Sequence, residues 1–169
     1  MVSEKTSPIA VVLGSDSDLD TMQRCFDRLR YFGIEPIIRI ISAHRTADIA
    51  AEFADTAEQN GIKVIIAAAG MAAHLAGALA ARTTLPIIGV PMIASAGLGG
   101  LDALLSTVQM PGGVPVATVT LGKAGADNAA ILAVQILALS DSSLKEKLVE
   151  FKCQQCEKVI EKNKALKNI

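Results

Sequence analysis

The feature that most constrains the fold is a long segment that is almost free of charge. Between Lys63 and Lys123 the only charged residues are Arg82 and Asp102. Val64–Ala81, inside this segment, approaches the length of a membrane-spanning helix. Glycine and proline nevertheless divide the segment into pieces of strand or short-helix length, and several pieces are rich in valine and isoleucine. The segment therefore predicts a buried α/β core, and no membrane partner is expected.

Length and charge limit the organisation of the chain further. The 169 residues fit one domain with a substantial core. We predict a single α/β domain over residues 1–169, with a core at about 9–140 and a C-terminal helical extension at about 143–167. A formal net charge of −1 leaves no broad basic surface, so nucleic acid is not expected as a partner.

The cysteines indicate a reducing compartment. They are odd in number, Cys25, Cys153 and Cys156, and the first residues lack the apolar core of a signal peptide. We therefore expect a cytoplasmic protein. The Cys153–Cys156 spacing is that of half a zinc site or of a redox pair, but no second Cys/His pair is near in the sequence, so no metal is expected.

Apolar runs alternate with helical patterns along the chain. We predict strands at about 9–13, 35–40, 63–68, 87–90 and 116–120, and helices at about 19–33, 47–59, 73–82, 101–108, 127–139 and 143–164. Leu19, Met22, Phe26 and Leu29 mark the buried side of the first helix. This order predicts an α/β fold with an open parallel sheet of about five strands, flavodoxin- or Rossmann-like, covered by helices on both sides.

Three loops follow the first three strands and should share one edge of the sheet, where ligands bind in such folds. The second loop, Ser42–Thr46, places His44 beside a cation and two hydroxyls. An imidazole exchanges protons near pH 7, and Arg45 offers fixed donors to phosphate or carboxylate. The alternative is a turn with a solvated His-Arg pair, in which Thr46 caps the following helix.

The first and third loops leave two interpretations each. Gly14–Asp18 can hold a phosphate with its hydroxyls and backbone N–H groups, and Asp18 can accept from sugar hydroxyls. Alternatively, Ser17 or Asp18 simply caps a helix. In the third loop, His74 is either a structural residue or a neighbour of His44 in a reactive site. Two histidines without an acid cluster are too few for zinc.

The segment from Ala72 to Ala81 is apolar on every side of a helix. A surface helix of a small monomer would show a polar face. We therefore expect its outer face to contact another subunit in a homo-oligomer.

Five motifs, taken in order, resemble the bacterial 5-(carboxyamino)imidazole ribonucleotide mutases of purine biosynthesis, the catalytic subunit of phosphoribosylaminoimidazole carboxylase. The likeness covers roughly Ile9 to Leu139. The motifs are Gly14-Ser-Asp-Ser-Asp18, Ser42-Ala-His-Arg-Thr46, Gly70-Met-Ala-Ala-His-Leu75, Gly100-Leu-Asp102 and Val108-Gln-Met-Pro-Gly-Gly-Val-Pro115.

The resemblance implies a three-layer α/β fold, a homo-octamer, and transfer of a carboxylate from the exocyclic nitrogen to ring carbon 4 of an aminoimidazole ribonucleotide, without metal or cofactor. By matching position, His44 would be the general acid/base and the Gly70–His74 loop would shelter the migrating carboxylate. We predict His44 and His74 as catalytic. The predicted substrate-binding residues are Ser15, Ser17, Asp18, Ser42, Ala43, Arg45, Gly70, Met71, Ala72, Ala73 and Leu75.

The sequence departs from the family pattern at a few positions. The family usually has proline where Ala47 and Ala76 stand and often glycine at Met71, and the segment 92–99 matches poorly. The direct carboxylase branch, which uses free carbon dioxide, usually has lysine at Arg45 and lacks the Ala-Ala-His-Leu run. That branch remains an alternative, as does a nucleotide-binding oligomer without catalytic activity.

Overall fold

The computed structural model describes residues 6–166 and contains six α-helices and a five-stranded sheet in that range. The chain divides into two compact units, one up to Ala133 and one from Val134. The elements are β1 (Ile9–Leu13), a 3-10 helix η1 (Asp16–Asp18), α1 (Leu19–Tyr31), β2 (Ile37–Ile40), α2 (Ala47–Thr56), β3 (Val64–Gly70), α3 (Leu75–Ala80), β4 (Ile87–Met92), α4 (Leu101–Val108), β5 (Ala117–Thr118), α5 (Gly122–Leu137) and α6 (Ser142–Ala165).

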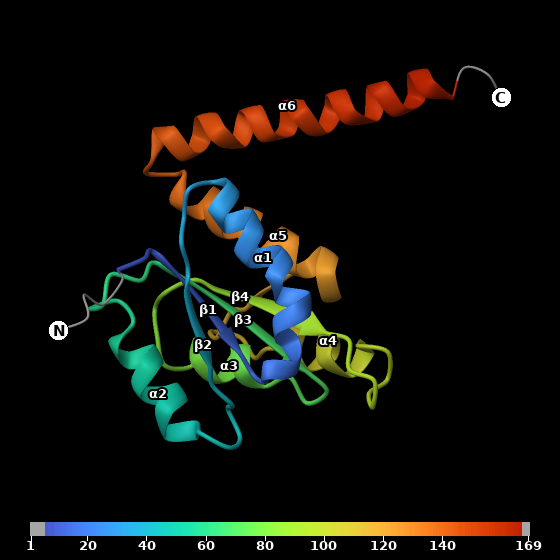
Figure 1. Ribbon diagram of the computed structural model, residues 1–169. Coiled ribbons are helices and arrows are strands. Elements are labelled where there is room, and N and C mark those ends of the chain that lie inside the picture. Colours follow the sequence, from blue (N-terminus) through green and yellow to red (C-terminus); the bar gives the residue numbers. More distant parts are fainter. Residues whose placement is uncertain (1–5, 167–169) are drawn as a thin grey trace. The chain divides into compact units, whose positions relative to one another are not determined.

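The strands form one parallel sheet in the order β2-β1-β3-β4-β5 (Figure 1). The predicted open parallel sheet is thus confirmed. The chain moves outward from β1 to β2 and then returns to the other side of β1 to form β3. In α/β sheets the carboxyl ends of the strands at such a reversal form a crevice for ligands.

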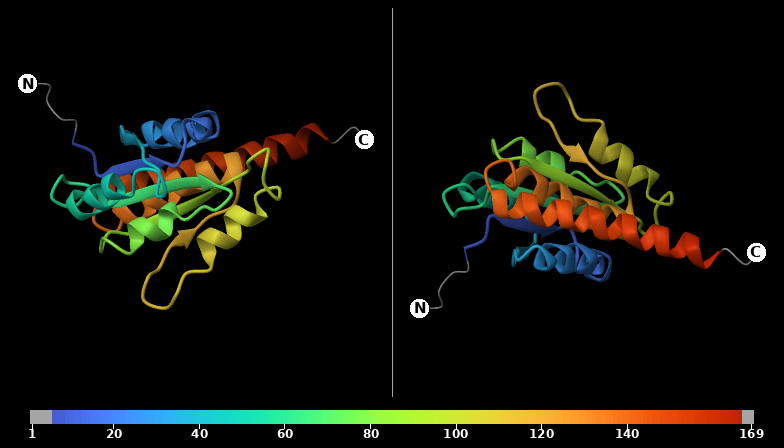
Figure 2. Two further views of the ribbon diagram at one scale, coloured as in Figure 1. Left: turned by 90° about the horizontal axis from the view of Figure 1, so that it is seen from below. Right: turned by 90° about the horizontal axis from the view of Figure 1, so that it is seen from above.

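The strands β1 and β3 are apolar in every position, so apolar side chains point to both faces of the sheet, and helices cover both faces. Ala10 of β1 and Ile65 of β3 belong to a buried cluster with Leu75 and Leu79 of α3. Successive side chains of a strand point to opposite faces, so Val11 points to the other side. Figure 2 shows α1 on that side of the sheet and α3 on the opposite one.

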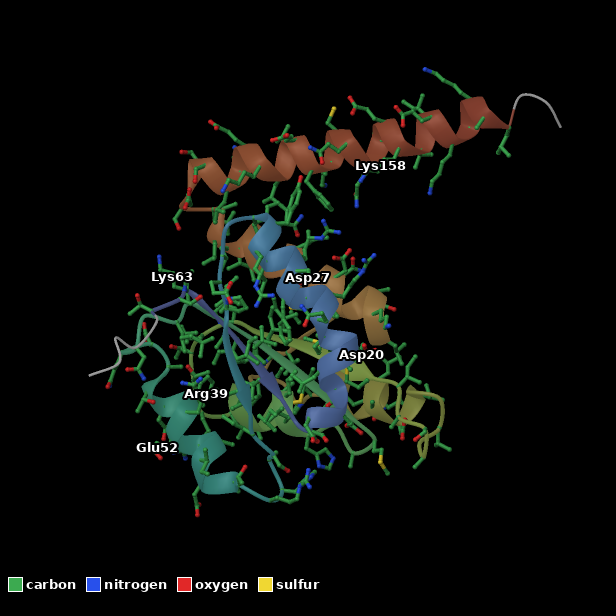
Figure 3. All side chains as sticks on the ribbon, viewed as in Figure 1. Asp20, Asp27, Arg39, Glu52, Lys63 and Lys158 are labelled. Carbon is green, nitrogen blue, oxygen red and sulfur yellow. The ribbon has the colours of Figure 1, made fainter. Side chains whose placement is uncertain are left out.

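Helix α1 buries one stripe of its surface and leaves the rest polar. Met22, Phe26 and Leu29 are buried as predicted, together with Cys25, whereas Leu19 is exposed. Figure 3 shows charged side chains such as Asp20 and Asp27 of α1, and Arg39 of the outer strand β2, on the outside. Burial raises the pKa of the Cys25 thiol to about 12, so this thiol stays protonated.

Several element boundaries differ from the prediction near the site. Strands β3 and β4 both run two residues further, because Ala69 pairs with Pro91 and Gly70 with Met92. Helix α3 begins at Leu75 rather than Ala73, since tight turns occupy the residues before it. Helix α5 begins at Gly122 rather than Asp127.

The second unit contains α6, which is described here by itself. Asp141 caps it, because its Oδ1 accepts from the backbone N–H groups of Ser143 and Leu144 at 2.9 and 3.3 Å. Three residues predicted to share one face, Leu144, Leu148 and Phe151, are buried. The predicted extension reached residue 167, which lies outside the described residues. Within residues 6–166 we find no helix with the length and apolar character needed to cross a bilayer.

Candidate active site

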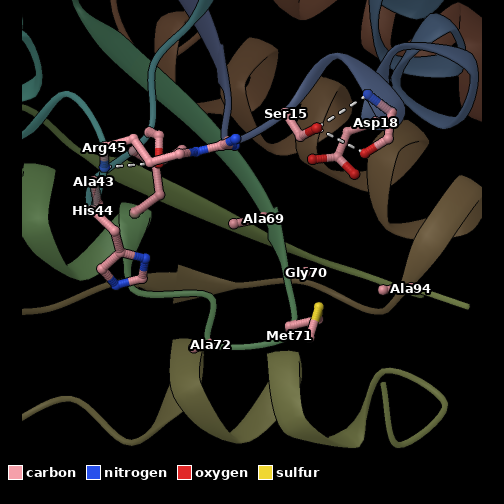
Figure 4. A pocket seen from close by; sticks show the side chains of 14 residues that line it. Ser15, Asp18, Ala43, His44, Arg45, Ala69, Gly70, Met71, Ala72 and Ala94 are labelled. Atoms are coloured by element: carbon pink, nitrogen blue, oxygen red, sulfur yellow. Dashed lines mark hydrogen bonds between the residues drawn. The ribbon is translucent and has the colours of Figure 1, made fainter. Parts of the chain in front are cut away.

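The loops after β1, β2 and β3 meet around one cavity of about 520 Å³ at the carboxyl edge of the sheet (Figure 4). The expectation that these loops share an edge is therefore correct. Most of the lining is small or polar, so the cavity has room and hydrogen-bonding groups for a polar ligand. The lining residues are Gly14, Ser15, Ser17, Asp18, Ser42, Ala43, His44, Arg45, Ala69, Gly70, Met71, Ala72, Leu75 and Ala94.

Ser15 organises the first loop. Its Oγ accepts from the backbone N–H of Ser17 at 3.3 Å and from the Ser17 hydroxyl at 2.9 Å, and it donates to Asp16 Oδ1 at 3.1 Å. Ser15, and neither Ser17 nor Asp18, thus provides the side chain that caps the first turn. The Gly14 N–H donates to the carbonyl of Ala68 at 2.9 Å, which ties the loop to β3.

Asp18 brings a half-buried carboxylate to the same wall of the cavity. Burial raises its pKa above the ordinary aspartate value and the nearby Asp16 adds to the effect, while a hydrogen bond with the Ser15 backbone opposes it. The charged form therefore lacks part of the solvation that it would have in water. A ligand that donates hydroxyl hydrogens to this carboxylate would replace that solvation.

The second loop is a closed turn between Ser42 and Thr46. The Ser42 N–H donates to Thr46 Oγ1 at 3.0 Å, and the Thr46 hydroxyl donates to the Ser42 carbonyl at 3.0 Å. Thr46 occupies the N-cap position of α2, but its side chain makes no capping hydrogen bond there. The predicted N-cap position is confirmed, but the Thr46 hydroxyl does not cap α2, because it holds the turn that carries His44 and Arg45.

Arg45 is fixed at its base by the same turn. Its backbone N–H and its Nε donate to Ser42 Oγ at 3.2 and 3.4 Å. Figure 4 shows the side chain crossing the cavity wall toward the loop of Ser15 and Asp18. The remaining guanidinium donors can therefore reach an anion held between the first and second loops.

His44 lines the cavity, whereas His74, also predicted as catalytic, does not line it and contacts the His44 ring. His44 Nε2 and His74 Nδ1 lie 2.9 Å apart, and the rings meet edge to face at 84°. Both side chains are exposed. A neutral imidazole is a donor at one nitrogen and an acceptor at the other, so the contact couples the tautomers of the two rings: one of the two nitrogens carries the hydrogen and the other accepts it. Of the two interpretations of His74, the structure favours the one in which it neighbours His44.

The third loop places its residues by tight turns. The N–H groups of Ala73 and His74 donate to the carbonyls of Met71 and Ala72 at 2.9 and 2.8 Å. Met71 has a φ of 54°, which lies in the left-handed region that residues other than glycine rarely adopt. Gly70, Met71, Ala72 and Leu75 line the cavity as the prediction requires, but Ala73 is buried and does not line it.

Three cavity residues, Gly14, Ala69 and Ala94, were missing from the predicted set. Gly14 could have been found, since it begins the first loop. Ala94 gives no signal in the sequence, because it enters the cavity only through the extended pairing of β3 with β4. A side chain on Gly70 would lie 3.5 Å from the Ala94 Cβ, so the two backbones approach closely there.

Comparison with known proteins identifies the family. The family model described as AIR carboxylase matches residues 8–158. The chain belongs to this family. The N5-carboxyaminoimidazole ribonucleotide mutase of Bacillus subtilis is 54% identical over 142 residues, which cover 84% of this chain and 87% of the relative. The mutase of Escherichia coli (strain K12) is 47% identical over 162 residues, 95% of each chain.

A solved structure extends the family likeness to three dimensions. The crystal structure of Treponema denticola PurE matches with a TM-score of 0.84 and 29% sequence identity, over 94% of this chain and 98% of that chain. The resemblance predicted from the five motifs is confirmed, and so is the flavodoxin-like fold class.

Proposed function

We propose that this protein is an isomerase that converts 5-(carboxyamino)imidazole ribonucleotide to 4-carboxy-5-aminoimidazole ribonucleotide in de novo purine (IMP) biosynthesis. The observation that carries the proposal is the arrangement of the cavity. His44, which is paired with His74, lines the cavity together with Arg45 and with Ser15, Ser17 and Asp18 of the first loop. Mutases that are 47–54% identical to this chain support it.

The first two loops bind the ribose phosphate in this proposal. Arg45 and the hydroxyls of Ser15, Ser17 and Ser42 hold the phosphate, because guanidinium and hydroxyl donors match phosphate oxygens. Asp18 accepts hydrogen bonds from the ribose hydroxyls. The base is thereby directed toward His44.

The reaction then needs one proton carrier. His44 in its protonated form donates to the exocyclic nitrogen as the nitrogen–carbon bond to the carboxylate breaks and carbon dioxide leaves. Ring carbon 4 attacks the carbon dioxide, and His44 takes the proton that carbon 4 loses. The proton balance closes, and the enzyme ends in its starting state. General acid/base catalysis of this kind contributes roughly 10²–10⁴-fold to a rate.

The third loop retains the carbon dioxide between the two steps. Gly70 and Ala72 leave space beside the base, while Met71 and Leu75 give that space apolar walls. Holding two small reactants in place replaces an encounter in solution by a local step, and apolar walls limit access of water. Ala43 completes the wall beside His44.

His74 orients His44 and completes the catalytic pair. When the His44 Nε2–H donates to His74 Nδ1, the Nδ1 of His44 is the atom that exchanges the proton with substrate. The 2.9 Å separation between the two nitrogens is that of a hydrogen bond, and the proposal takes His44 as its donor because the protonated His44 carries hydrogen on both nitrogens.

The protein works as a homo-octamer in the cytoplasm, with one catalytic domain per chain. Leu101, Leu105 and Val108 form an exposed apolar stripe on α4, which supports burial against another subunit. The free thiols of Cys25, Cys153 and Cys156 are typical of a reducing compartment.

The direct test supplies two substrates separately. The purified protein is given the carboxyamino ribonucleotide, and then aminoimidazole ribonucleotide with a low concentration of bicarbonate. A mutase converts only the first. Rapid conversion of the second would instead identify a direct carboxylase, and binding of both without turnover would identify a nucleotide-binding protein.

A further inference from the structure

The chain between β4 and α4 forms a loop whose two ends lie together. We call residues 93–100 the 93–100 loop. A Cβ on Gly100, at its end, would lie 3.1 Å from the Cγ1 of Ile93, at its start. Gly100 has a φ of 89°, which glycine adopts without strain. The next residue after Ile93 is Ala94, which lines the cavity. The shape of this loop therefore determines where one wall of the cavity stands.

The Asp102 carboxylate holds the middle of the 93–100 loop. Asp102 stands in the first turn of α4, and its Oδ2 accepts from the Leu98 N–H at 3.3 Å. A Cβ on Gly97 would lie 2.6 Å from the same oxygen, so the carboxylate lies directly against the Gly97 backbone. The Gly97 N–H in turn donates to the Ala94 carbonyl at 3.2 Å. A continuous series of contacts therefore connects the carboxylate to the cavity wall at Ala94.

The second oxygen of this carboxylate, Asp102 Oδ1, is buried without a hydrogen-bond partner among residues 6–166. A buried acceptor that lacks a donor costs free energy, and an ionised carboxylate has several acceptor positions. Asp141 shows how such a group is satisfied elsewhere, because its Oδ1 accepts from the N–H groups of Ser143 and Leu144. One further N–H from the 93–100 loop would satisfy Asp102 in a similar way.

Two features of the 93–100 loop allow it to bring that N–H closer. Gly99 has a φ of 67°, and a Cβ there would meet nothing within 4 Å. Ile93 and Leu98 are 62% and 76% exposed, so little apolar packing holds the outer part of the loop. Segments with few buried contacts change shape at low cost in free energy. The loop itself can therefore supply the donor.

We propose that Asp102 is a positioning residue of the cavity, whose Oδ2 holds the Leu98 N–H and whose Oδ1 takes a second N–H of the 93–100 loop when the nucleotide is bound. Where it concerns the reaction, this inference rests on the proposed function. A Cβ on Gly70 would lie 3.5 Å from the Ala94 Cβ. The held loop thus keeps the Ala94 methyl group against the loop that retains carbon dioxide.

Three variants separate the roles of the two oxygens. Asp102→Ala removes both. Asp102→Asn keeps one acceptor for the Leu98 N–H but puts an NH2 group, which accepts nothing, in the place of Oδ1. Gly97→Ala keeps the carboxylate and displaces it, since the added Cβ would lie 2.6 Å from Oδ2. Ser106→Ala is the matched control, because the Ser106 hydroxyl donates to the Asp102 carbonyl at 2.7 Å and so contacts the same residue without touching its carboxylate.

Amide hydrogen exchange, with and without the product nucleotide, measures both contacts. In the unmodified protein we expect the nucleotide to slow exchange of one further amide of the 93–100 loop by about two- to tenfold. Asp102→Asn should keep the slow exchange at Leu98 and lose this added effect, whereas Asp102→Ala and Gly97→Ala should lose both. Ser106→Ala should behave like the unmodified protein. Exchange that does not respond to the nucleotide, or an Asp102→Asn variant that responds like the unmodified protein, would overturn the proposal.

The reaction gives a second measurement. Each turnover ends either in the carboxylated product or in escape of carbon dioxide, which leaves aminoimidazole ribonucleotide. In an escape the proton from His44 stays on the exocyclic nitrogen, and His44 regains a proton from water. Asp102→Asn and Gly97→Ala should raise the share of aminoimidazole ribonucleotide by about two- to tenfold, with KM little changed. A residue that only stabilises the fold would lower the amount of active protein and leave this share unchanged, and that result would refute the positioning role.

The two proposals fail in different ways. If the unmodified protein binds the nucleotide but converts no substrate, the proposed function is wrong, and hydrogen exchange of the 93–100 loop still decides the role of Asp102. If the unmodified protein converts the substrate while exchange of this loop ignores the nucleotide, the proposed function stands and the role of Asp102 is wrong.

Discussion

The histidine pair gives a prediction that separates orientation from proton transfer. The atom of His74 that meets His44 is Nδ1, at 2.9 Å from His44 Nε2. An asparagine side chain places its amide close to the position of a histidine Nδ1, and its oxygen can accept the same hydrogen bond without taking up a proton. A leucine fills similar space but accepts nothing. His74→Asn and His74→Leu therefore form a matched pair of variants.

The expected magnitudes follow from the contact. A hydrogen bond between protein groups contributes about 0.5–1.5 kcal/mol, and this one is exposed to water, so the lower half of that range applies. We expect His74→Leu to lower kcat about two- to fivefold. His74→Asn should stay within about twofold of the unmodified protein. His44→Asn removes the proton carrier, and its loss should be about 10²–10⁴-fold.

The assay measures initial rates with saturating carboxyamino substrate across the pH range, and binding of the product nucleotide serves as a control for an intact cavity. If His74 only orients His44, the pH profile of His74→Asn keeps the shape of the unmodified protein. A loss in His74→Asn as large as that in His44→Asn would show that the proton passes through both rings, and the reasoning would be refuted.

Three further predictions concern stability. Asp18→Asn should raise the free energy of unfolding at neutral pH, because the folded state raises the pKa of this carboxyl and so penalises its charged form. This gain in stability should disappear below pH 3.8, the ordinary pKa of the side chain, where the carboxyl is protonated in both states. The substitution should also lower the affinity for substrate. Met71→Gly should stabilise the fold by about 1 kcal/mol by removing the cost of its positive φ; an unchanged denaturation midpoint would contradict this. Gly89→Ala should destabilise by about 1–3 kcal/mol, since the added Cβ would meet Thr107 Cγ2 at 2.4 Å; a calorimetric melting temperature equal to that of the unmodified protein would disprove it.

The sheet and most of its helices could be predicted from the sequence, because apolar periodicity and glycine or proline breaks are local signals. Helix α4 begins and ends where its pattern does, and the order of strands and helices follows the same alternation. Pro91 is the reason why the predicted strand ended at residue 90, whereas β4 runs to Met92. A proline lacks the N–H that a ladder uses, yet here it pairs opposite Ala69 at the end of the sheet.

Residues of the candidate site could be predicted where a motif contains reactive or charged side chains. They could not be predicted where the pairing of segments distant in sequence determines which residues meet. Ser15, His44 and Arg45 stand out by residue type, and all three line the cavity. The contact between His44 and His74 joins residues 30 positions apart and depends on the order of β1, β2 and β3. Ala94 has no chemical signature, so only the folded chain reveals it.

The ladder between Gly70 and Met92 also bears on how this enzyme could be redesigned. Ala69 and Gly70 at the end of β3 line the cavity and carry a methyl group at most, so this part of its shape is kept by any sequence that keeps small residues there. Variants that accept a different substrate base must then carry their substitutions at the rim of the cavity, where Met71 and Ala94 lie. Libraries that aim at altered substrates should diversify these two positions first and leave the strands untouched.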